Sequence, residues 1–254
     1  MEGGLAKADL TEWEQLGHVI NGQLQGTGSD HYNRYETDFQ DLQAMGANLN
    51  KVVLEWSRIQ PTPSTFDAAA IAHYHAVINS LIAKGIRPVA CLNHFSLPTW
   101  VNSPINPSTD LDGWQNPSVA FAFQTFATQM AQEFGATIDW WQTFNEPEFM
   151  ALLAYAVGLF PPGVINDSGQ ILQAMQVVAL AHSLAYTAIH ANDTVDADGD
   201  GNAALVSVVS SVNEWVARDP NNPAVEALRP QRRSIHDDLV FATALAFWRA
   251  SWRL

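Results

Sequence analysis

The 254-residue sequence contains a single cysteine, Cys91, so no disulfide can form within the chain. Nothing therefore requires an oxidising compartment, and Cys91, which lies in an apolar run, is expected to be a buried thiol. Basic residues are also scarce, because 12 Lys and Arg stand against 26 Asp and Glu, for a net charge of −14. Such a charge disfavours nucleic acid and anionic membranes as partners and favours a neutral ligand.

Signals for export, membrane insertion or cofactors are missing as well. The first residues contain no basic segment followed by an apolar one, and no apolar run approaches the roughly 18 residues of a membrane span. His73 and His75 lie two apart in a helical pattern, which places them on different faces and disfavours joint metal ligation. We therefore expect a cytoplasmic protein without a metal or cofactor.

Apolar residues make up 47% of the chain, enough for one sizeable core. Short, nearly continuous apolar stretches alternate with longer amphipathic ones. The stretches with strand character are 48–57, 86–95, 137–146 and 203–212. Apolar runs of this length are typical of strands buried on both faces, as in a parallel sheet. We expect one α/β domain over residues 1–254, either a doubly wound sheet or a (β/α)₈ barrel.

Five stretches have helix patterns with recognisable start and stop signals. They are 34–46, 66–85, 116–135, 167–192 and 236–250. Gly46, Gly85 and Gly135 end the first three, as glycine often does after a helix. Asp167 and Gln170 have the spacing of a capping box at the start of the fourth.

Polar side chains follow the predicted strands, at the end where βα folds carry their chemistry. His94 follows the second strand, and Asn145 and Glu146 follow the third. Aromatic neighbours would partly desolvate Glu146 and favour the protonated form that a general acid needs. A glycosidase pocket typically combines side chains that hydrogen-bond sugar hydroxyls, aromatic rings and one carboxyl group of this kind.

Residues 143–147, Thr-Phe-Asn-Glu-Pro, resemble the acid/base signature of the family 1 glycoside hydrolases, which are retaining β-glucosidases and β-galactosidases. Residues 30–61 resemble the family's stretch around its second strand, and their "EWSRI" is similar to archaeal-type members. Residues 92–101 resemble its His-aromatic-x-Leu-Pro segment, and 143–163 continue as those enzymes do. The opening "EGG" followed by "EW" resembles the family just after its first strand. The resemblance covers most of residues 2–165 and weakly the remainder.

The resemblance implies roles for individual residues. Glu146 would be the acid/base, Asn145 would bind the 2-hydroxyl of the sugar, and His94 would contact a hydroxyl of the same sugar. Trp141 would be a structural aromatic. Lys51 stands where the family carries an arginine that orients the nucleophile, and lysine lacks the planar two-pronged geometry of arginine.

The resemblance also implies a partial barrel, approximately strands 2–5 of eight with their helices. The family's nucleophile lies on the seventh strand in a Thr-Glu-Asn-Gly-like motif, and no such motif occurs in this sequence. Glu214 follows the strand next to that of Glu146, so we interpret it as a loop or helix-start carboxylate. Glu55 is expected to pair with a buried basic group. Trp100 and Trp114 could line a sugar site or fill the core.

Residues 196–207 contain Asp196, Asp198 and Asp200 at alternate positions followed by Gly201, like the first half of an EF-hand loop. The twelfth position is Ser207, where calcium coordination needs a bidentate glutamate. The pattern favours a solvated acidic turn over a calcium site, and the sequence does not decide between them.

The sequence therefore predicts a retaining β-glycosidase acting on terminal β-glycosides or oligosaccharides, inactive as this chain alone because the nucleophile strand is missing. The alternative is a non-catalytic half-barrel that binds sugar or a partner protein. Another retaining barrel family with an Asn-Glu-Pro acid/base would share the chemistry, but it fits the flanking segments less well. Unpaired sheet edges would favour self-association or a complementing C-terminal fragment.

Overall fold

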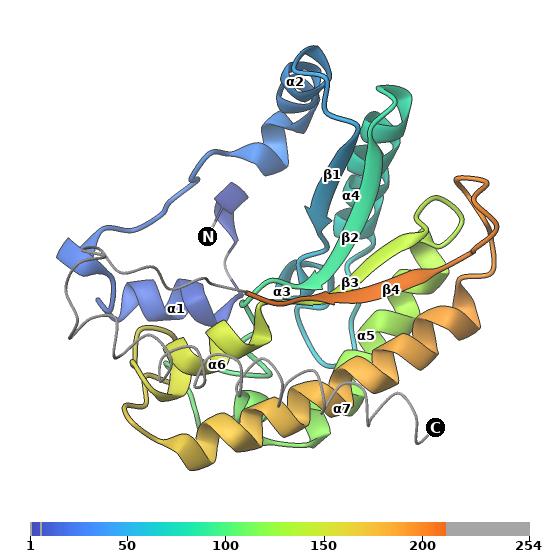
Figure 1. Cartoon of the computed structure of the whole chain (residues 1–254). Helices are drawn as coiled ribbons and strands as arrows, with labels where there is room; N and C mark the ends of the chain where they lie inside the picture. The colour runs from blue at the N-terminus through green and yellow to red at the C-terminus, as the bar shows by residue number, and fades with distance from the viewer. Residues whose placement is uncertain (1, 6, 212–254) are drawn as a thin grey trace, which may run out of the picture.

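The computed structural model describes residues 2–5 and 7–211. Within them, one parallel sheet has the strand order β1-β2-β3-β4 (Figure 1). The strands are β1 (Leu49–Val53), β2 (Arg87–Asn93), β3 (Trp140–Asn145) and β4 (Leu205–Val209). Each lies inside a predicted range, which confirms the strand predictions. Because the order follows the chain without reversal, the sheet has the winding of part of a (β/α)₈ barrel and not of a doubly wound sheet.

Within the described residues, helices precede and connect the strands. They are α1 (Asp9–Gln15), α2 (His31–Ala44), α3 (Trp56–Ile59), α4 (Ala68–Ala83), α5 (Ser118–Phe134), α6 (Pro147–Tyr155) and α7 (Ser168–Asn192), with 3₁₀ turns η1 (Glu2–Gly4), η2 (Ile20–Gly22) and η3 (Gly113–Gln115). The predictions for α2, α4, α5 and α7 are confirmed, whereas α1, α3 and α6 were not predicted. The predicted helix at 236–250 and Glu214 lie outside the described residues.

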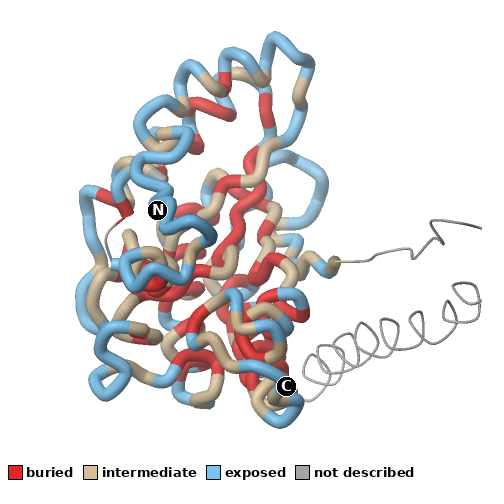
Figure 2. The backbone as a smooth tube through the Cα atoms, turned by 90° about the vertical axis from the view of Figure 1, so that its left-hand side faces the viewer, coloured by how far each residue is buried: buried red, intermediate tan, exposed pale blue. Residues whose placement is uncertain are grey.

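The core lies between the sheet and helices α5 and α7. Trp141 of β3 is fully buried, and its indole Nε1 donates to Asp193 Oδ2 at 2.8 Å, which confirms a structural role for this aromatic. Thr143 Oγ1 lies 2.7 Å from Nδ1 of His182 on α7. Figure 2 shows the buried positions running along the sheet and the inner sides of the helices. The sheet is thus fastened to α7 by polar contacts as well as apolar packing.

Helix α7 begins where the sequence predicts. Asp167 Oδ1 accepts from the backbone N–H of Gln170 at 3.0 Å, and Gln170 Nε2 donates to Asp167 Oδ2 at 3.2 Å. By length and composition α7 could cross a membrane, contrary to the expectation from the sequence. Yet 56% of its most apolar window is buried inside the protein. Packing in the core therefore accounts for its apolar side chains.

The glycines that end helices do so for two different reasons. Gly46 and Gly85 have φ values of 79° and 72°, the left-handed conformation of a helix stop. Gly135 has a φ of −60° and is instead required by close packing. A Cβ atom there would lie 2.6 Å from the Ala131 oxygen and 2.9 Å from the Asp193 carboxylate.

Helix α1 is attached to the connections at the carboxyl end of the sheet, close to α6 (Figure 1). Asp9 is buried, and its Oδ1 accepts from the Leu97 N–H at 2.8 Å. Glu12 Oε2 accepts from Ser103 Oγ at 2.7 Å. Trp13 Nε1 donates to the Leu159 oxygen at 2.9 Å. These contacts hold α1 over the edge where the predicted site residues lie.

Candidate active site

The chain passes from β3 into α6 through a single strained residue. Glu146 has φ 45° and ψ 55°, a left-handed conformation that costs about 1–3 kcal/mol in a non-glycine residue. Its N–H donates to the Val209 oxygen at 2.7 Å, and its oxygen accepts from the Met150 N–H at 3.0 Å. Pro147 follows as the first residue of α6, where its missing N–H is not needed. Strand and helix therefore both hold the backbone of Glu146.

An irregularity in β3 determines where Asn145 points. The pairing register between β3 and β4 shifts between Gln142 and Asn145. Thr143 contacts His182 of α7, and the next residue, Phe144, packs against Phe123 of α5 with ring centroids 4.8 Å apart. Two consecutive side chains thus face the helices, whereas successive side chains of a regular strand point to opposite faces of the sheet. Asn145 consequently faces the other side of the sheet.

On that side Asn145 meets Lys51 of β1. Lys51 Nζ donates to Asn145 Oδ1 at 2.7 Å, although 94 residues separate the two in sequence. Asn145 is 6% exposed. The neighbouring Glu146 is half-buried, and its carboxylate makes no hydrogen bond or ion pair within the described part of the chain. A half-buried carboxyl without a protein partner can exchange a proton with a ligand.

His94 directly follows β2, the strand between those of Lys51 and Asn145. It is half-buried, with its ring edge-on to Phe95 at a centroid distance of 4.7 Å. Burial and, to a smaller extent, the charge of Lys51 lower the pKa of His94. The imidazole is therefore neutral at pH 7 and can donate or accept a hydrogen bond to a hydroxyl.

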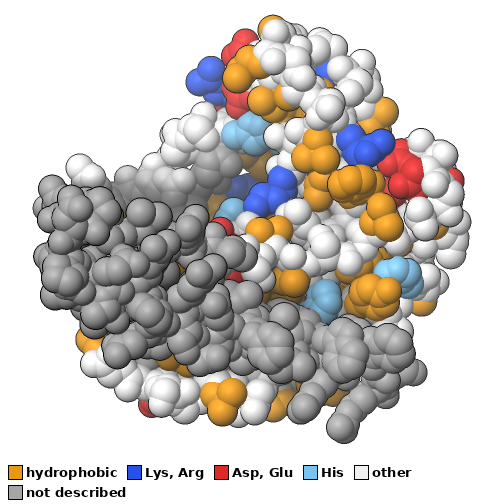
Figure 3. Space-filling view, in the orientation of Figure 1, with side chains coloured by type: hydrophobic (Ala, Val, Ile, Leu, Met, Phe, Trp, Pro, Cys, Tyr) orange, Lys and Arg blue, Asp and Glu red, His pale blue; other side chains and the backbone are white. Residues whose placement is uncertain are grey.

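A cavity of about 640 Å³ opens beside His94. Its lining includes Glu55 just before α3, Arg58 of α3, and Trp13 of α1, whose indole stacks on His18 at 3.7 Å. Figure 3 shows basic and histidine side chains gathered near the middle of the visible face. Asn145 and Glu146 do not line this cavity. The structure thus places the predicted residues on adjacent strand ends, with His94 alone in the cavity wall.

Other predicted residues have structural roles. Glu55 accepts from Ser57 Oγ at 2.7 Å and Ser96 Oγ at 2.8 Å, so the predicted pairing with a basic group is wrong. Serine hydroxyls satisfy its carboxylate at the start of α3. Trp114 is 2% exposed and packs on aromatic side chains of the core. Trp100 packs edge-on to a buried indole and donates from Nε1 to the Gln60 oxygen at 2.9 Å.

Two contacts of the site were missed by reasoning from the sequence. One is the bond between Lys51 and Asn145, which only the pairing order of the strands brings about. The other is Glu148, a buried carboxylate in the first turn of α6 that accepts from the Ser211 N–H. Its position two residues after Glu146 could have indicated the start of a helix, because acidic residues are favoured in the first turn of a helix.

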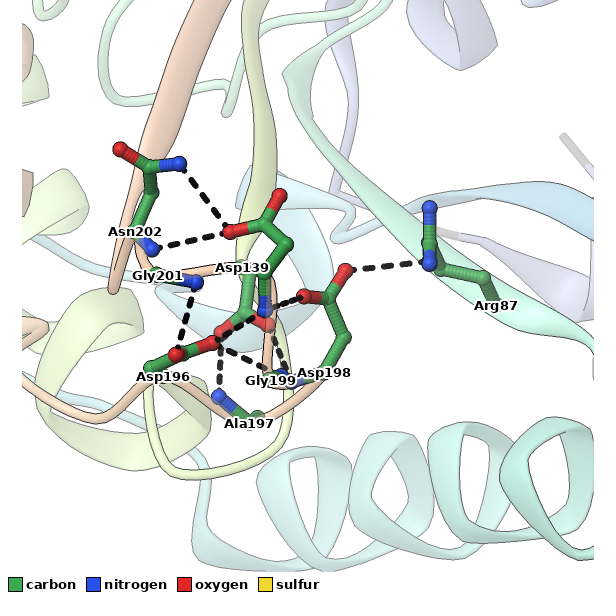
Figure 4. A network of polar contacts seen from close by, with 9 residues as sticks. Arg87, Asp139, Asp196, Ala197, Asp198, Gly199, Gly201 and Asn202 are labelled. Atoms are coloured by element: carbon green, nitrogen blue, oxygen red, sulfur yellow. Dashed lines mark hydrogen bonds and ion pairs between the residues drawn. The ribbon is translucent and has the colours of Figure 1, made fainter.

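The acidic loop lies at the amino end of the sheet, opposite the site, because it meets Asp139 directly before β3 and Arg87 at the start of β2. Figure 4 shows its polar contacts. Asp139, Asp196 and Asp198 bring carboxylate oxygens within 4.8 Å of one another, whereas Asp200 is not part of this group. Asp139 accepts from two backbone N–H groups of the loop, and Asp198 pairs with Arg87 at 3.2 Å. Burial raises the pKa of Asp139. These carboxylates thus already have partners, because backbone N–H groups donate hydrogen bonds to them and Arg87 forms an ion pair with Asp198.

Comparison with known proteins places the chain among glycosidases by sequence. The sequence pattern of glycosyl hydrolase family 1 matches residues 4–244. A β-galactosidase of Pyrococcus woesei is 30% identical over 263 aligned positions, which cover 88% of this chain and 51% of that protein. Human lactase/phlorizin hydrolase is 31% identical over 181 positions, which cover 68% of this chain and 9% of that protein.

Solved structures show the same fold. Fpglu1 of Fervidobacterium superposes with a TM-score of 0.74 at 26% identity, covering 92% of this chain and 54% of that one. The β-glycosidase of Pyrococcus horikoshii superposes with a TM-score of 0.77 at 20% identity, covering 95% of this chain and 52% of that one. The chain thus spans about half the length of these structures and of the P. woesei β-galactosidase, which confirms the predicted partial barrel. On the extent of the sequence match, this chain belongs to glycosyl hydrolase family 1.

Proposed function

We propose that this chain carries the acid/base half of a retaining β-glycosidase that hydrolyses terminal β-D-glycosides. The observation that supports this most is the strained turn after β3. There, Glu146 is held in a left-handed conformation with a half-buried carboxylate that no described side chain engages. Strain of this kind persists where the surrounding structure imposes it, and it is concentrated at functional sites.

In the proposed reaction, Glu146 first protonates the oxygen of the leaving group as the bond to the anomeric carbon breaks. A second carboxylate attacks that carbon from the other face and forms a glycosyl-enzyme ester. Glu146 then takes a proton from water, the water oxygen bonds to the anomeric carbon, and the ester breaks with overall retention. Asn145 and His94 would hold hydroxyl groups of the sugar.

The second carboxylate has to come from another part of the barrel. The sequence contains no Thr-Glu-Asn-Gly-like motif, and a retaining pair must lie about 5–5.5 Å apart. We propose that the chain alone does not turn over. Among the described residues, β1 and β4 are each paired on one side only, so an added fragment or a second copy could pair with these edges.

The experiment is complementation. The chain is assayed for hydrolysis of p-nitrophenyl β-D-glucoside alone and after refolding with the C-terminal half of the P. woesei β-galactosidase. The expected result is activity in the mixture only. Glu146→Gln in the mixture should reduce kcat/KM by about 10²–10⁴, the usual contribution of general acid–base catalysis. Glu133→Gln on α5 is the matched control and should leave the rate unchanged.

A non-catalytic half-barrel that binds sugar is the alternative, favoured by the missing nucleophile motif. It predicts binding of methyl β-D-glucoside with no turnover in either preparation. Full activity of the Glu146→Gln mixture would exclude the proposed role of this residue.

A further inference from the structure

Lys51 is a half-buried cation in the middle of β1. Its ammonium group reaches past β2 to the end of β3 and donates to Asn145 Oδ1 at 2.7 Å. Within the described residues it has no carboxylate partner at ion-pair distance. A half-buried charge without a counterion lowers the stability of the folded state. Its presence in the middle of a strand therefore needs a reason.

The bond determines which way the Asn145 amide faces. A lysine ammonium has donors only, so the atom of Asn145 that faces it must be the oxygen. The amide NH₂ therefore points away from Lys51. Asn145 is 6% exposed, and no described residue accepts a hydrogen bond from its Nδ2. Two N–H donors are thus left for an acceptor atom from outside this part of the chain.

Neighbouring groups do not neutralise the charge. Cys91 of β2 is buried, and burial raises its pKa to about 11, so it is a thiol and not a thiolate at pH 7. Glu55 accepts hydrogen bonds from serine hydroxyls and makes no ion pair with Lys51 within the described residues. His94, in contrast, responds to Lys51, because the ammonium contributes to lowering the pKa of the imidazole after the larger effect of burial. The charge of Lys51 therefore reaches both predicted sugar-binding side chains.

We infer that Lys51 is the positioning residue of this site, which fixes the Asn145 side chain with its NH₂ group directed at a hydroxyl oxygen of the sugar. This inference rests on the proposed function for the identity of the ligand, but the contact itself does not. Asn145 then acts as a hydrogen-bond donor and discriminates against a sugar that lacks an acceptor oxygen at that place. A lysine makes this contact through one N–H, whereas arginine would offer a planar fork.

The test uses the full chain and NMR, so it needs no turnover. Histidine ring resonances and the side-chain NH₂ resonances of Asn145 are followed in the unmodified chain, Lys51→Met, Lys51→Arg and the control Lys84→Met. Lys84 pairs with Glu36 on α2 at 2.7 Å. In Lys51→Met the His94 titration midpoint should rise by roughly half a pH unit or more, and the Asn145 NH₂ signals should shift. Lys51→Arg should restore the midpoint, and Lys84→Met should change neither.

Affinity for methyl β-D-glucoside, measured by chemical-shift titration, should fall about tenfold in Lys51→Met and recover in Lys51→Arg. Equal His94 midpoints and equal Asn145 signals in the unmodified chain and Lys51→Met would overturn the inference. Failure of the proposed function is seen separately. In that case the midpoint and amide shifts still occur, but the mixture with the C-terminal half of the P. woesei β-galactosidase does not hydrolyse p-nitrophenyl β-D-glucoside.

Discussion

Asp9 of α1 accepts a hydrogen bond from the N–H of Leu97 at 2.8 Å, across 88 residues of sequence. The second carboxylate oxygen accepts from Asn102 Nδ2 at 2.8 Å. Burial raises the pKa of Asp9 to about 7, although these hydrogen bonds oppose the effect. The helix that covers the carboxyl end of the sheet is therefore fastened by a carboxyl group that titrates near neutral pH.

Replacing Asp9 by asparagine should flatten the dependence of stability on pH. The pKa of Asp9 is about 7 in the folded state against a reference value of 3.8. The folded state therefore binds this proton more tightly than the unfolded state. The resulting stability is complete below about pH 4 and is lost as pH rises through 7. Measured by urea unfolding, the free energy of unfolding should fall between pH 5 and 8 by about 2–3 kcal/mol more in the unmodified chain than in Asp9→Asn.

Asp41→Asn is the control for this measurement, because Asp41 is exposed on α2. Its stability should change with pH as that of the unmodified chain does. Parallel curves for the unmodified chain and Asp9→Asn would contradict the titration of Asp9.

Two phenylalanines of α5 allow a matched test of core packing. Phe123 is 0% exposed and packs against Trp56 and Phe144, whereas Phe121 is 54% exposed on the same helix. Phe123→Ala should reduce the free energy of unfolding by about 3–5 kcal/mol, because it removes buried area and leaves a cavity. Phe121→Ala should stay within about 0.5 kcal/mol in the same denaturant series. Similar losses for both variants would show that α5 packs differently.

The start of α7 depends on Asp167. Its carboxylate accepts from the Gln170 N–H, so Asp167→Ala leaves that donor without its cap. Thermal unfolding of Asp167→Ala should show a loss of about 1 kcal/mol. Ser168→Ala at the next position keeps the cap and should have a much smaller effect. If the two variants have the same melting temperature, the cap makes no measurable contribution to stability.

Calcium should not stabilise the chain. The carboxylates of the loop that contains Asp196 and Asp198 accept backbone N–H groups, and Asp198 is paired with Arg87 at 3.2 Å. Moving the melting point requires an ion that binds the folded state more tightly than the unfolded one. Melting curves in 1 mM CaCl₂ and in EDTA should therefore coincide. A saturable rise of several degrees with calcium would instead identify the loop as a cation site.

Local signals in the sequence were sufficient for the regular elements. The strands, the start of α7 at Asp167 and the stops at Gly46 and Gly85 each depend on residues a few positions apart, so they can be read from a short window. Helix α6 was missed because the apolar run of β3 leads straight into it, with one left-handed residue, Glu146, between them.

The sequence alone determined the family resemblance, the four strands and the place of Asn145 and Glu146 at a strand end. Only the tertiary structure decided what those residues touch. The bond from Lys51 to Asn145 spans 94 residues and exists because parallel strands pair in chain order while β3 shifts its register before Asn145. Short-range patterns set the conformation of each segment, but contacts between distant segments follow from how the segments pack.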